Sequence, residues 1–266
     1  MKLLVVLILM MLAASCPAQA QQWAADKLQR SPRHMEWISA KGGKHLVKCF
    51  VAYPEVKDKA TAVVVIHEIF GLTDWVREVC DQLAAEGFIA IAPDLLSGTT
   101  FASGNANQPG DIDSARKAIS LLPPHQITSD LNAVTKYVLK VPSCNGRVAV
   151  AGFCWGGGQA FRLATNNQQI KASFVFYGTA PEQRLAHINC PIYGFYGEND
   201  ARVTTTVGST TELMKKAGKR YEAVIYNGAG HGFMRTGEAP DSGEDNEKAR
   251  SQAWKRLKDL LQALSH

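Results

Sequence analysis

The fold is decided by a short β-like run, Arg147–Ala151 (RVAVA), followed at once by Gly152–Gly157 (GFCWGG). A strand that ends in Gly-x-nucleophile-x-Gly and turns directly into a helix is the pattern of a nucleophile elbow, here with cysteine at position 154. Such a turn crowds the neighbouring Cβ atoms, so glycine is favoured two residues either side of Cys154. The next residues, Gly158–Ala164 (GQAFRLA), read as a helix. The pattern predicts a thiol at a helix N-terminus, where unpaired N–H groups favour a thiolate and an oxyanion.

Apolar runs alternate with helix-spaced segments on both sides of this turn. Further strands are predicted over 62–66, 88–92, 172–177, 192–196 and 221–226. Apolar residues recur at helical spacing over 76–84, 115–122, 127–138, 207–217 and 254–264. The stretch from Gly98 to Gly110 is rich in glycine and polar residues and is interpreted as an exposed loop. Strands separated by helices indicate βαβ units, and therefore an α/β fold whose mostly parallel central sheet is flanked by helices.

Two later residues are candidates for the base and for the acid that orients it. His231 follows the last strand in Gly228–Phe233 (GAGHGF), and Asp200 follows another strand in Tyr196–Asp200 (YGEND). A thiol nucleophile needs a base and a group that orients the base. Glu198 competes with Asp200, but the chain order nucleophile, acid, histidine is that of the α/β-hydrolase fold and selects Asp200 and His231.

The loop after the first buried strand, His67–Gly71 (HEIFG), is the candidate oxyanion loop. Its first two residues resemble the start of a zinc-binding His-Glu-x-x-His, but Gly71 stands where the second histidine would be, so that motif fails. In an α/β-hydrolase such a loop donates one oxyanion N–H and the residue after the nucleophile donates the other. We therefore expect the backbone N–H groups of Ile69 and Trp155 to form an oxyanion hole.

Five motifs in this order resemble those of the dienelactone hydrolase family: His67–Gly71, Ala92–Leu95 (APDL), Gly152–Gly157, Gly197-x-x-Asp200 and Gly230–Phe233 (GHGF). The resemblance covers about residues 45–265. It implies an α/β-hydrolase fold and a Cys154–His231–Asp200 triad. It also implies that the enzyme uses no metal and no organic cofactor.

The resemblance implies roles for two more residues. Glu68 would accept the thiol proton as substrate binds, and its charge would raise the pKa of the resting thiol. Arg235 matches one of two arginines with which family members grip the carboxylate of dienelactone. The other arginine is missing, because the loop that should carry it reads Leu95–Gly98 (LLSG). Arg116 or Arg202 could replace it.

The N-terminus has the pattern of a secretory signal: Lys2, an apolar run over Leu3–Ala14, and a small-x-small end at Ala18–Ala20. The apolar run is shorter than the roughly 20 residues of a spanning helix, so no stable membrane span is expected after cleavage. We predict cleavage after Ala20 and a periplasmic or secreted protein. Lipoprotein processing at Cys16 is the less favoured alternative. Residues 21–44 are interpreted as an N-terminal lead-in, loose over 21–33, and residues 45–266 as one catalytic domain.

Composition argues against several other classes of protein. The formal charge of +5 falls to +4 without the leader, and no block of lysine and arginine suggests nucleic-acid binding. Five cysteines remain after the leader, none spaced as Cys-x-x-Cys, which argues against a thioredoxin-type centre or a zinc knuckle. Besides Cys154, these are Cys49, Cys80, Cys144 and Cys190, and their pairing is left open, as is the oligomeric state.

The sequence therefore predicts an exported hydrolase of a small carboxylic ester or lactone that uses Cys154 as its nucleophile. A thioesterase or acyltransferase with the same thiol ester is one alternative, and a non-catalytic ligand-binding protein of the same fold is another. In a third, Cys154 is only a disulfide partner.

Overall fold

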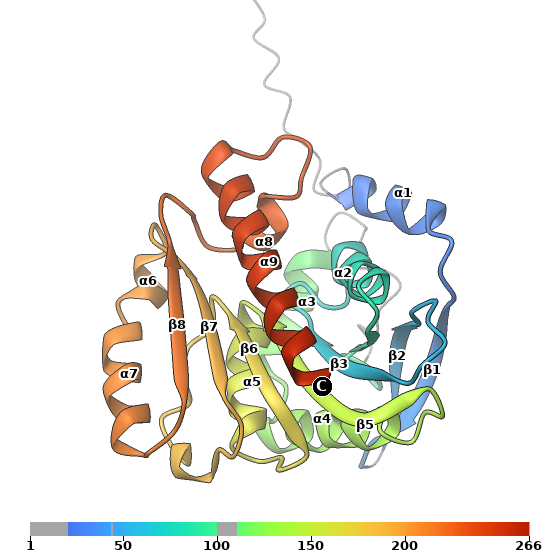
Figure 1. Cartoon of the computed structure of the whole chain (residues 1–266), viewed down its shortest axis with the longest axis horizontal. Coiled ribbons are helices and arrows are strands. Elements are labelled where there is room, and N and C mark those ends of the chain that lie inside the picture. The colour runs from blue at the N-terminus through green and yellow to red at the C-terminus, as the bar shows by residue number, and fades with distance from the viewer. Residues whose placement is uncertain (1–20, 44, 100–110, 266) are drawn as a thin grey trace, which may run out of the picture.

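The protein is built around one eight-stranded sheet, seen in a computed structural model that describes residues 21–43, 45–99 and 111–265 (Figure 1). Its strand order is β1-β2-β4-β3-β5-β6-β7-β8. The strands are β1 (Met35–Lys41), β2 (Leu46–Ala52), β3 (Ala60–Ile66), β4 (Ile89–Pro93), β5 (Cys144–Phe153), β6 (Ile170–Phe176), β7 (Ile192–Gly197) and β8 (Tyr221–Tyr226). From β4 to β8 every neighbouring pair is parallel, whereas β2 runs antiparallel to both β1 and β4.

Helices cover both faces of the sheet. One face carries α1 (Gln22–Arg30), α2 (Asp74–Ala85), α8 (Phe233–Thr236) and α9 (Glu244–Ser265). The other carries α3 (Asp111–Ser120), α4 (Pro124–Val138), α5 (Trp155–Ala164) and α7 (Val207–Lys216). The short helices η2 (Leu185–His187) and α6 (Ala201–Thr204) flank β7. Two helical layers over one sheet give the three-layer α/β arrangement.

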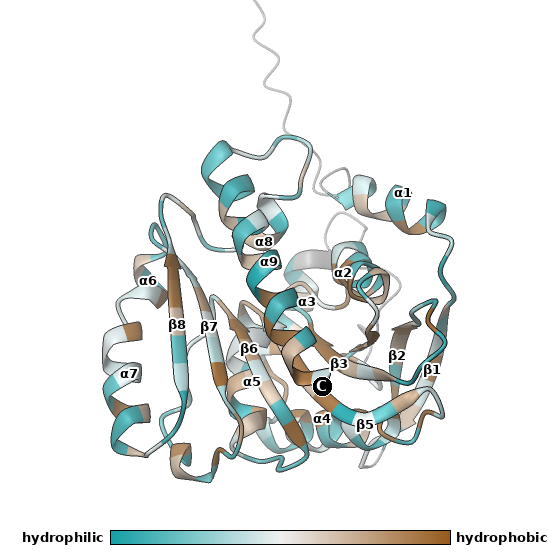
Figure 2. Ribbon diagram, in the orientation of Figure 1, coloured by the Kyte–Doolittle hydropathy of each residue, from teal (hydrophilic) through white to brown (hydrophobic). Residues whose placement is uncertain are grey.

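The central strand β3 shows why the sheet sits between two apolar layers. All seven of its residues are buried. Val63 and Val65 pack into the core beneath α2 and α9, and Val64 and Ile66 pack into the core beneath α4 and α5. Alternate side chains point to opposite faces of a strand, so a strand buried on both faces is apolar throughout. Figure 2 shows this apolar colour on β3, while α7 and α9 carry hydrophilic colour as well.

The predicted fold class is confirmed, and the strands and helices expected from the sequence are present. The prediction of a loose lead-in over 21–33 was wrong. That segment contains α1, whose Ala24 and Leu28 are buried in the core that also includes α2. The antiparallel strands β1 and β2 were missed, although both extend the same sheet.

Two predictions of the sequence analysis fall largely outside the described residues. The leader over residues 1–20 and nearly all of the predicted loop at 98–110 are not described. Among the helices of the described ranges, none is both long and apolar enough to cross a membrane.

Candidate active site

Cys154 occupies a strained turn between β5 and α5. Its backbone angles are φ 55° and ψ −117°, a conformation that non-glycine residues seldom adopt. A Cβ on Gly152 would lie 2.0 Å from the carbonyl oxygen of Gly156, and a Cβ on Gly156 would lie 2.3 Å from that of His67. Both glycines are therefore required by close backbone contacts, as the elbow pattern predicts.

Hydrogen bonds hold the elbow in place. The Cys154 N–H donates to the carbonyl of Phe176 in β6 at 3.0 Å, and the Gly157 N–H donates to the carbonyl of Cys154 at 3.0 Å. The first bond ties the turn to the neighbouring strand and the second closes the first turn of α5. The thiol is partly exposed at the carboxyl edge of the sheet.

His231 and Asp200 lie in line with the thiol. The distance from Cys154 Sγ to His231 Nε2 is 3.0 Å, and His231 Nδ1 lies 2.5 Å from Asp200 Oδ2. Asp200 is buried, whereas His231 is one-third exposed. The three residues come from the ends of β5, β7 and β8, which the parallel sheet brings to one edge. The arrangement has the nucleophile–base–acid geometry of covalent catalysis.

The competing carboxylate, Glu198, lies elsewhere. Its Oε2 accepts a hydrogen bond from the Gly228 N–H at 2.8 Å, and its own N–H donates to the Tyr226 carbonyl. Glu198 therefore braces the loop that carries His231 and does not orient the imidazole.

Glu68 and Arg235 are paired with each other at the side of the pocket. Arg235 Nε donates to Glu68 Oε2 at 2.7 Å, and the Glu68 side chain is only 3% exposed. The Glu68 charge is the first cause of a raised Arg235 pKa. The carboxylate expected to accept the thiol proton is thus occupied by a guanidinium in this state.

The thiol is held in its neutral form. Burial raises the pKa of Cys154, and the negative charge of Glu68 raises it further. The backbone N–H groups of Trp155 and Ile69 and the charge of Arg202 act in the opposite direction. Ile69, Trp155 and Cys154 also line one cavity, so the structure places both predicted oxyanion donors beside the reacting atom.

A cavity of about 550 Å³ opens beside the thiol, and we call it the elbow pocket. It is lined by Cys154, Trp155 and His231 and also by three arginines, Arg116, Arg202 and Arg235. The stretch Leu95–Gly98 does not line it. Among the described residues, Arg202 has no ion-pair partner, and half-exposed Arg116 lies 3.6 Å from Asp113. Positive charge therefore reaches this pocket from α3 and α6, the elements that carry the two arginines suggested as replacements.

Tyr177, which the sequence analysis placed only at a strand end, is part of the site. Its side chain lines the elbow pocket, and its ring meets the His231 imidazole edge-on at 5.1 Å. It is 1% exposed with φ 40°, and no described atom hydrogen-bonds its hydroxyl. No sequence motif singles it out, since a tyrosine ending an apolar strand usually belongs to the core.

The other cysteines are separate from this site. Cys49, Cys80, Cys144 and Cys190 are buried free thiols. Burial raises the pKa of Cys49 to about 12 and that of Cys190 to about 11, so both are poor nucleophiles. Within the described ranges, no group of three or more histidine, cysteine, aspartate or glutamate side chains is placed to hold a metal ion.

The sheet order, the elbow and the residues at its edge define an α/β-hydrolase. Comparison with known proteins narrows this class. The sequence model of the dienelactone hydrolase family matches residues 47–265, and the chain belongs to that family.

Relatives and solved structures agree with this assignment. A Salmonella typhimurium protein named as a carboxymethylenebutenolidase is 31% identical over 198 residues, 69% of this chain and 72% of that protein. A Saccharolobus solfataricus protein of the same name is 29% identical over 82% of this chain and 95% of its own length. The crystal structure of a Klebsiella pneumoniae protein described as a dienelactone hydrolase has a TM-score of 0.75 and 27% identity, and the match covers 86% of this chain and 98% of that one. The chain is a carboxylic ester or lactone hydrolase of the dienelactone hydrolase type.

Proposed function

We propose that this protein is an exported hydrolase that cleaves small esters or lactones bearing a negative charge, with Cys154, His231 and Asp200 as its catalytic triad. The observation that carries the proposal is the thiol–imidazole–carboxylate line, with distances of 3.0 and 2.5 Å. It lies in a pocket that also contains three arginines.

The distances suggest the course of the reaction. The thiol proton passes to His231 Nε2 as Cys154 Sγ bonds to the substrate carbonyl carbon. The resulting oxyanion accepts hydrogen bonds from the backbone N–H groups of Ile69 and Trp155. The imidazolium returns the proton to the leaving oxygen, and the carbon–oxygen bond breaks to leave a thiol ester. Water then gives its proton to His231 and attacks the thiol ester, which releases the acid and restores the thiol. Asp200 keeps Nδ1 protonated throughout and stabilises the imidazolium.

Glu68 and Arg235 would make the thiol responsive to substrate. A carboxylate on the substrate competes for the same guanidinium that now holds Glu68 at 2.7 Å. Once released, Glu68 becomes a second acceptor for the thiol proton, the role that the family resemblance implies. Until then burial and, second to it, the Glu68 charge raise the pKa of the thiol.

The arginines favour an anionic substrate. Arg202 has no ion-pair partner among the described residues, and its charge already acts on the thiol. A carboxylate near the scissile carbonyl would meet Arg202 and Arg235 within one pocket. Guanidinium groups suit carboxylates because their N–H donors match the two oxygens.

Export remains part of the proposal. The pattern of a signal over residues 2–20 supports it, with Lys2, an apolar run and a small-x-small end at Ala18–Ala20. The four other thiols are buried, which protects them from oxidation in an oxidising compartment. Cell fractionation with N-terminal sequencing tests this. A mature chain that starts at Gln21 is expected, and a cytosolic chain that starts at Met1 contradicts export.

Matched neutral and anionic substrates test the substrate class. An unsaturated γ-lactone with a carboxylate substituent and its methyl ester differ only in that charge. We expect kcat/KM for the acid to exceed that for the ester by about 10- to 100-fold, since a charged hydrogen-bonded contact contributes about 1.5–3 kcal/mol. Arg202→Gln should remove most of this preference, because it should lower kcat/KM for the acid far more than kcat/KM for the methyl ester. Equal kcat/KM for both lactones in the wild type contradicts an anionic substrate.

Addition of an alcohol or amine acceptor separates hydrolysis from acyl transfer. The proposal predicts free acid as the main product whether or not the acceptor is present. A new ester or amide that displaces the acid would identify an acyltransferase instead.

A further inference from the structure

His67 is a fully buried histidine that no step of the proposed reaction uses. It follows β3 directly, and its side chain is 0% exposed. Its Nδ1 lies 2.7 Å from the carbonyl oxygen of Glu68, and its Nε2 lies 3.4 Å from the backbone nitrogen of Leu95, which follows β4. The imidazole thus connects the ends of the neighbouring strands β3 and β4 with the loop that follows β3 and lines the elbow pocket.

These partners fix the tautomer of His67. A carbonyl oxygen only accepts and a backbone N–H only donates, so Nδ1 carries the proton and Nε2 carries the lone pair. Burial lowers the pKa of His67, in keeping with a neutral ring. The ring is therefore placed as a fixed donor and acceptor rather than as an acid or base.

The bond to Glu68 determines the direction of a catalytic N–H. The carbonyl of Glu68 and the N–H of Ile69 belong to one planar trans peptide, in which the two groups point in opposite directions. Holding the carbonyl on the His67 side therefore turns the Ile69 N–H the other way, and that N–H acts on the Cys154 sulfur. The same carbonyl also accepts the Gly71 N–H at 3.2 Å, so the peptide keeps one bond if the imidazole is removed.

The same ring contacts the residue that supplies the other oxyanion donor. The rings of His67 and Trp155 are stacked, with centroids 5.5 Å apart and an interplanar angle of 16°. The backbones also meet there, because the His67 carbonyl lies within 2.3 Å of a Cβ placed on Gly156. One side chain thus touches both Trp155 and the Glu68–Ile69 peptide.

We propose that His67 is a positioning residue that sets both N–H donors of the oxyanion hole. It does so through its hydrogen bond to the Glu68 carbonyl and its stack on Trp155. This inference rests on the proposed thiol mechanism, since the hole matters only if an oxyanion forms beside Cys154.

Three substitutions separate the contacts of the ring. In His67→Asn the nitrogen of the new side-chain amide can take the place of Nδ1 and keep the bond to Glu68. His67→Gln places its amide near Nε2 and loses that bond, and His67→Ala loses all contacts. Complete loss of one oxyanion donor costs about 10²–10³ in kcat, and a misdirected donor costs less. We expect His67→Ala to lower kcat about 10- to 100-fold with KM changed less than threefold. We expect the kcat of His67→Gln to lie between those of His67→Ala and His67→Asn, and that of His67→Asn to be at least about threefold higher than that of His67→Gln.

An aldehyde inhibitor provides a readout that misfolding would not mimic. Its carbonyl carbon bonds to Cys154 Sγ and its oxygen takes up the thiol proton or lies as the oxyanion in the hole, so its affinity reports the donors directly. Its Ki should rise in parallel with the fall in kcat, whereas KM for the ester should not. Thr135→Val, a buried substitution on α4 away from the pocket, controls for lost stability and should leave kcat and Ki unchanged.

Each outcome decides the proposal. Wild-type kcat and Ki in His67→Ala, in an enzyme whose Cys154→Ala variant is inactive, would overturn it. Where His67→Ala does not fold, equal kcat in His67→Asn and His67→Gln would overturn it as well. Full activity in Cys154→Ala would instead contradict the thiol mechanism on which the inference rests.

Discussion

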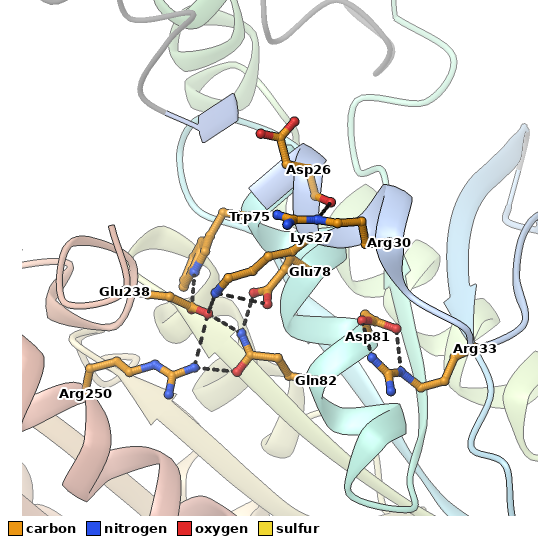
Figure 3. Close-up of polar contacts among 10 residues, drawn as sticks. All are labelled: Asp26, Lys27, Arg30, Arg33, Trp75, Glu78, Asp81, Gln82, Glu238 and Arg250. Atoms are coloured by element: carbon orange, nitrogen blue, oxygen red, sulfur yellow. Dashed lines mark hydrogen bonds and ion pairs between the residues drawn. The ribbon is translucent and has the colours of Figure 1, made fainter. Parts of the chain in front are cut away.

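Two buried glutamates, Glu68 and Glu78, both contact the short segment 235–238 but meet opposite charges there. Glu68, 3% exposed, is paired with the guanidinium of Arg235. Glu78, 4% exposed, faces a second carboxylate, Glu238, three residues after Arg235. The first pair borders the elbow pocket. The second lies in a polar cluster where α1, α2 and α9 meet, which we call the helix-junction cluster (Figure 3).

The helix-junction cluster shares its donors among its carboxylates. Gln82 donates to both Glu78 and Glu238. Lys27 Nζ lies 2.9 Å from Glu238 and 3.7 Å from Glu78, and Trp75 Nε1 donates to Glu238 at 3.2 Å. Arg250 pairs with Glu238 at 3.3 Å. Figure 3 shows these side chains converging from α1, α2, α9 and the turn that follows α8.

The difference shows how the neighbours of a buried carboxyl determine its electrostatic surroundings. Burial is the main cause that raises the pKa of Glu78 to about 8, and the nearby charge of Glu238 is the second. The charge of Lys27 acts in the opposite direction. Glu68 instead has a guanidinium to itself, and its negative charge in turn raises the pKa of the thiol. The protein thus pairs one buried carboxyl with a guanidinium beside the thiol and places the other beside a second carboxyl where the helices pack.

The largest difference between the two regions is expected in kcat when one buried carboxylate is removed from each of them. Asp200→Asn should lower kcat about 10⁴-fold, because the amide favours the wrong His231 tautomer. Glu238→Gln, in the helix-junction cluster, should change kcat by less than about twofold. Steady-state hydrolysis by both folded variants checks this. Similar losses in the two variants would show that the two regions do not differ in this way.

Breaking the Glu68–Arg235 pair should cost stability. Arg235→Gln leaves a buried, unpaired carboxylate and should lower the free energy of unfolding by about 3 kcal/mol. The double variant Glu68→Gln/Arg235→Gln should recover most of that loss, because no charge is then left unpaired. Urea denaturation of the two single variants and the double variant measures the coupling. Additive losses would contradict the pairing as described.

Stability should depend on pH through Glu78. Its pKa is 4.5 ordinarily and about 8 in the folded protein, so between these values the folded state binds more protons than the unfolded state. Stability from this group is full below about pH 4.5 and declines as pH rises toward 8, by at most about 1.4 kcal/mol per pH unit. The difference between wild type and Glu78→Gln in urea denaturation from pH 5 to 9 should show this slope. A constant difference would contradict the shift.

The charge of Glu68 should affect the rate at which the Cys154 thiol is alkylated. Because Glu68 raises the pKa of Cys154, Glu68→Gln should lower that pKa and speed alkylation by iodoacetamide at neutral pH. Glu78→Gln is the matched control and should leave the alkylation profile unchanged. A pH–rate profile of alkylation measures both variants. An unchanged or upward-shifted profile in Glu68→Gln would contradict the assigned cause.

The residues that meet at the elbow pocket could be predicted because each of them lies in a local sequence pattern. Cys154, Asp200 and His231 each follow a strand, and glycines surround the sharp turns at 152–157 and 228–232. In a parallel sheet, residues after different strands meet at one edge, so local patterns imply a distant contact. Arg116 and Arg202 were only suggested as pocket residues, because no sequence motif indicates how α3 and α6 are placed relative to the thiol.

The helix-junction cluster could not be predicted, because it joins residues that are far apart in the chain. Lys27, Gln82 and Arg250 meet only after α1, α2 and α9 have packed. Lys27 lies in the segment that was expected to be loose. That expectation rested on the polar composition of residues 21–33, in which only Ala24 and Leu28 of α1 are buried. The antiparallel strands β1 and β2 were missed because they lie outside the βαβ pattern.

The most direct test of the account follows the thiol itself. Wild type and Cys154→Ala should be mixed with an anionic aryl ester, stopped within one turnover and analysed by mass spectrometry alongside steady-state hydrolysis. The account predicts an acyl adduct on the peptide containing Cys154, a matching burst of the phenol, and a loss of hydrolysis of at least about 10³-fold in the folded variant. Undiminished hydrolysis by Cys154→Ala would contradict it.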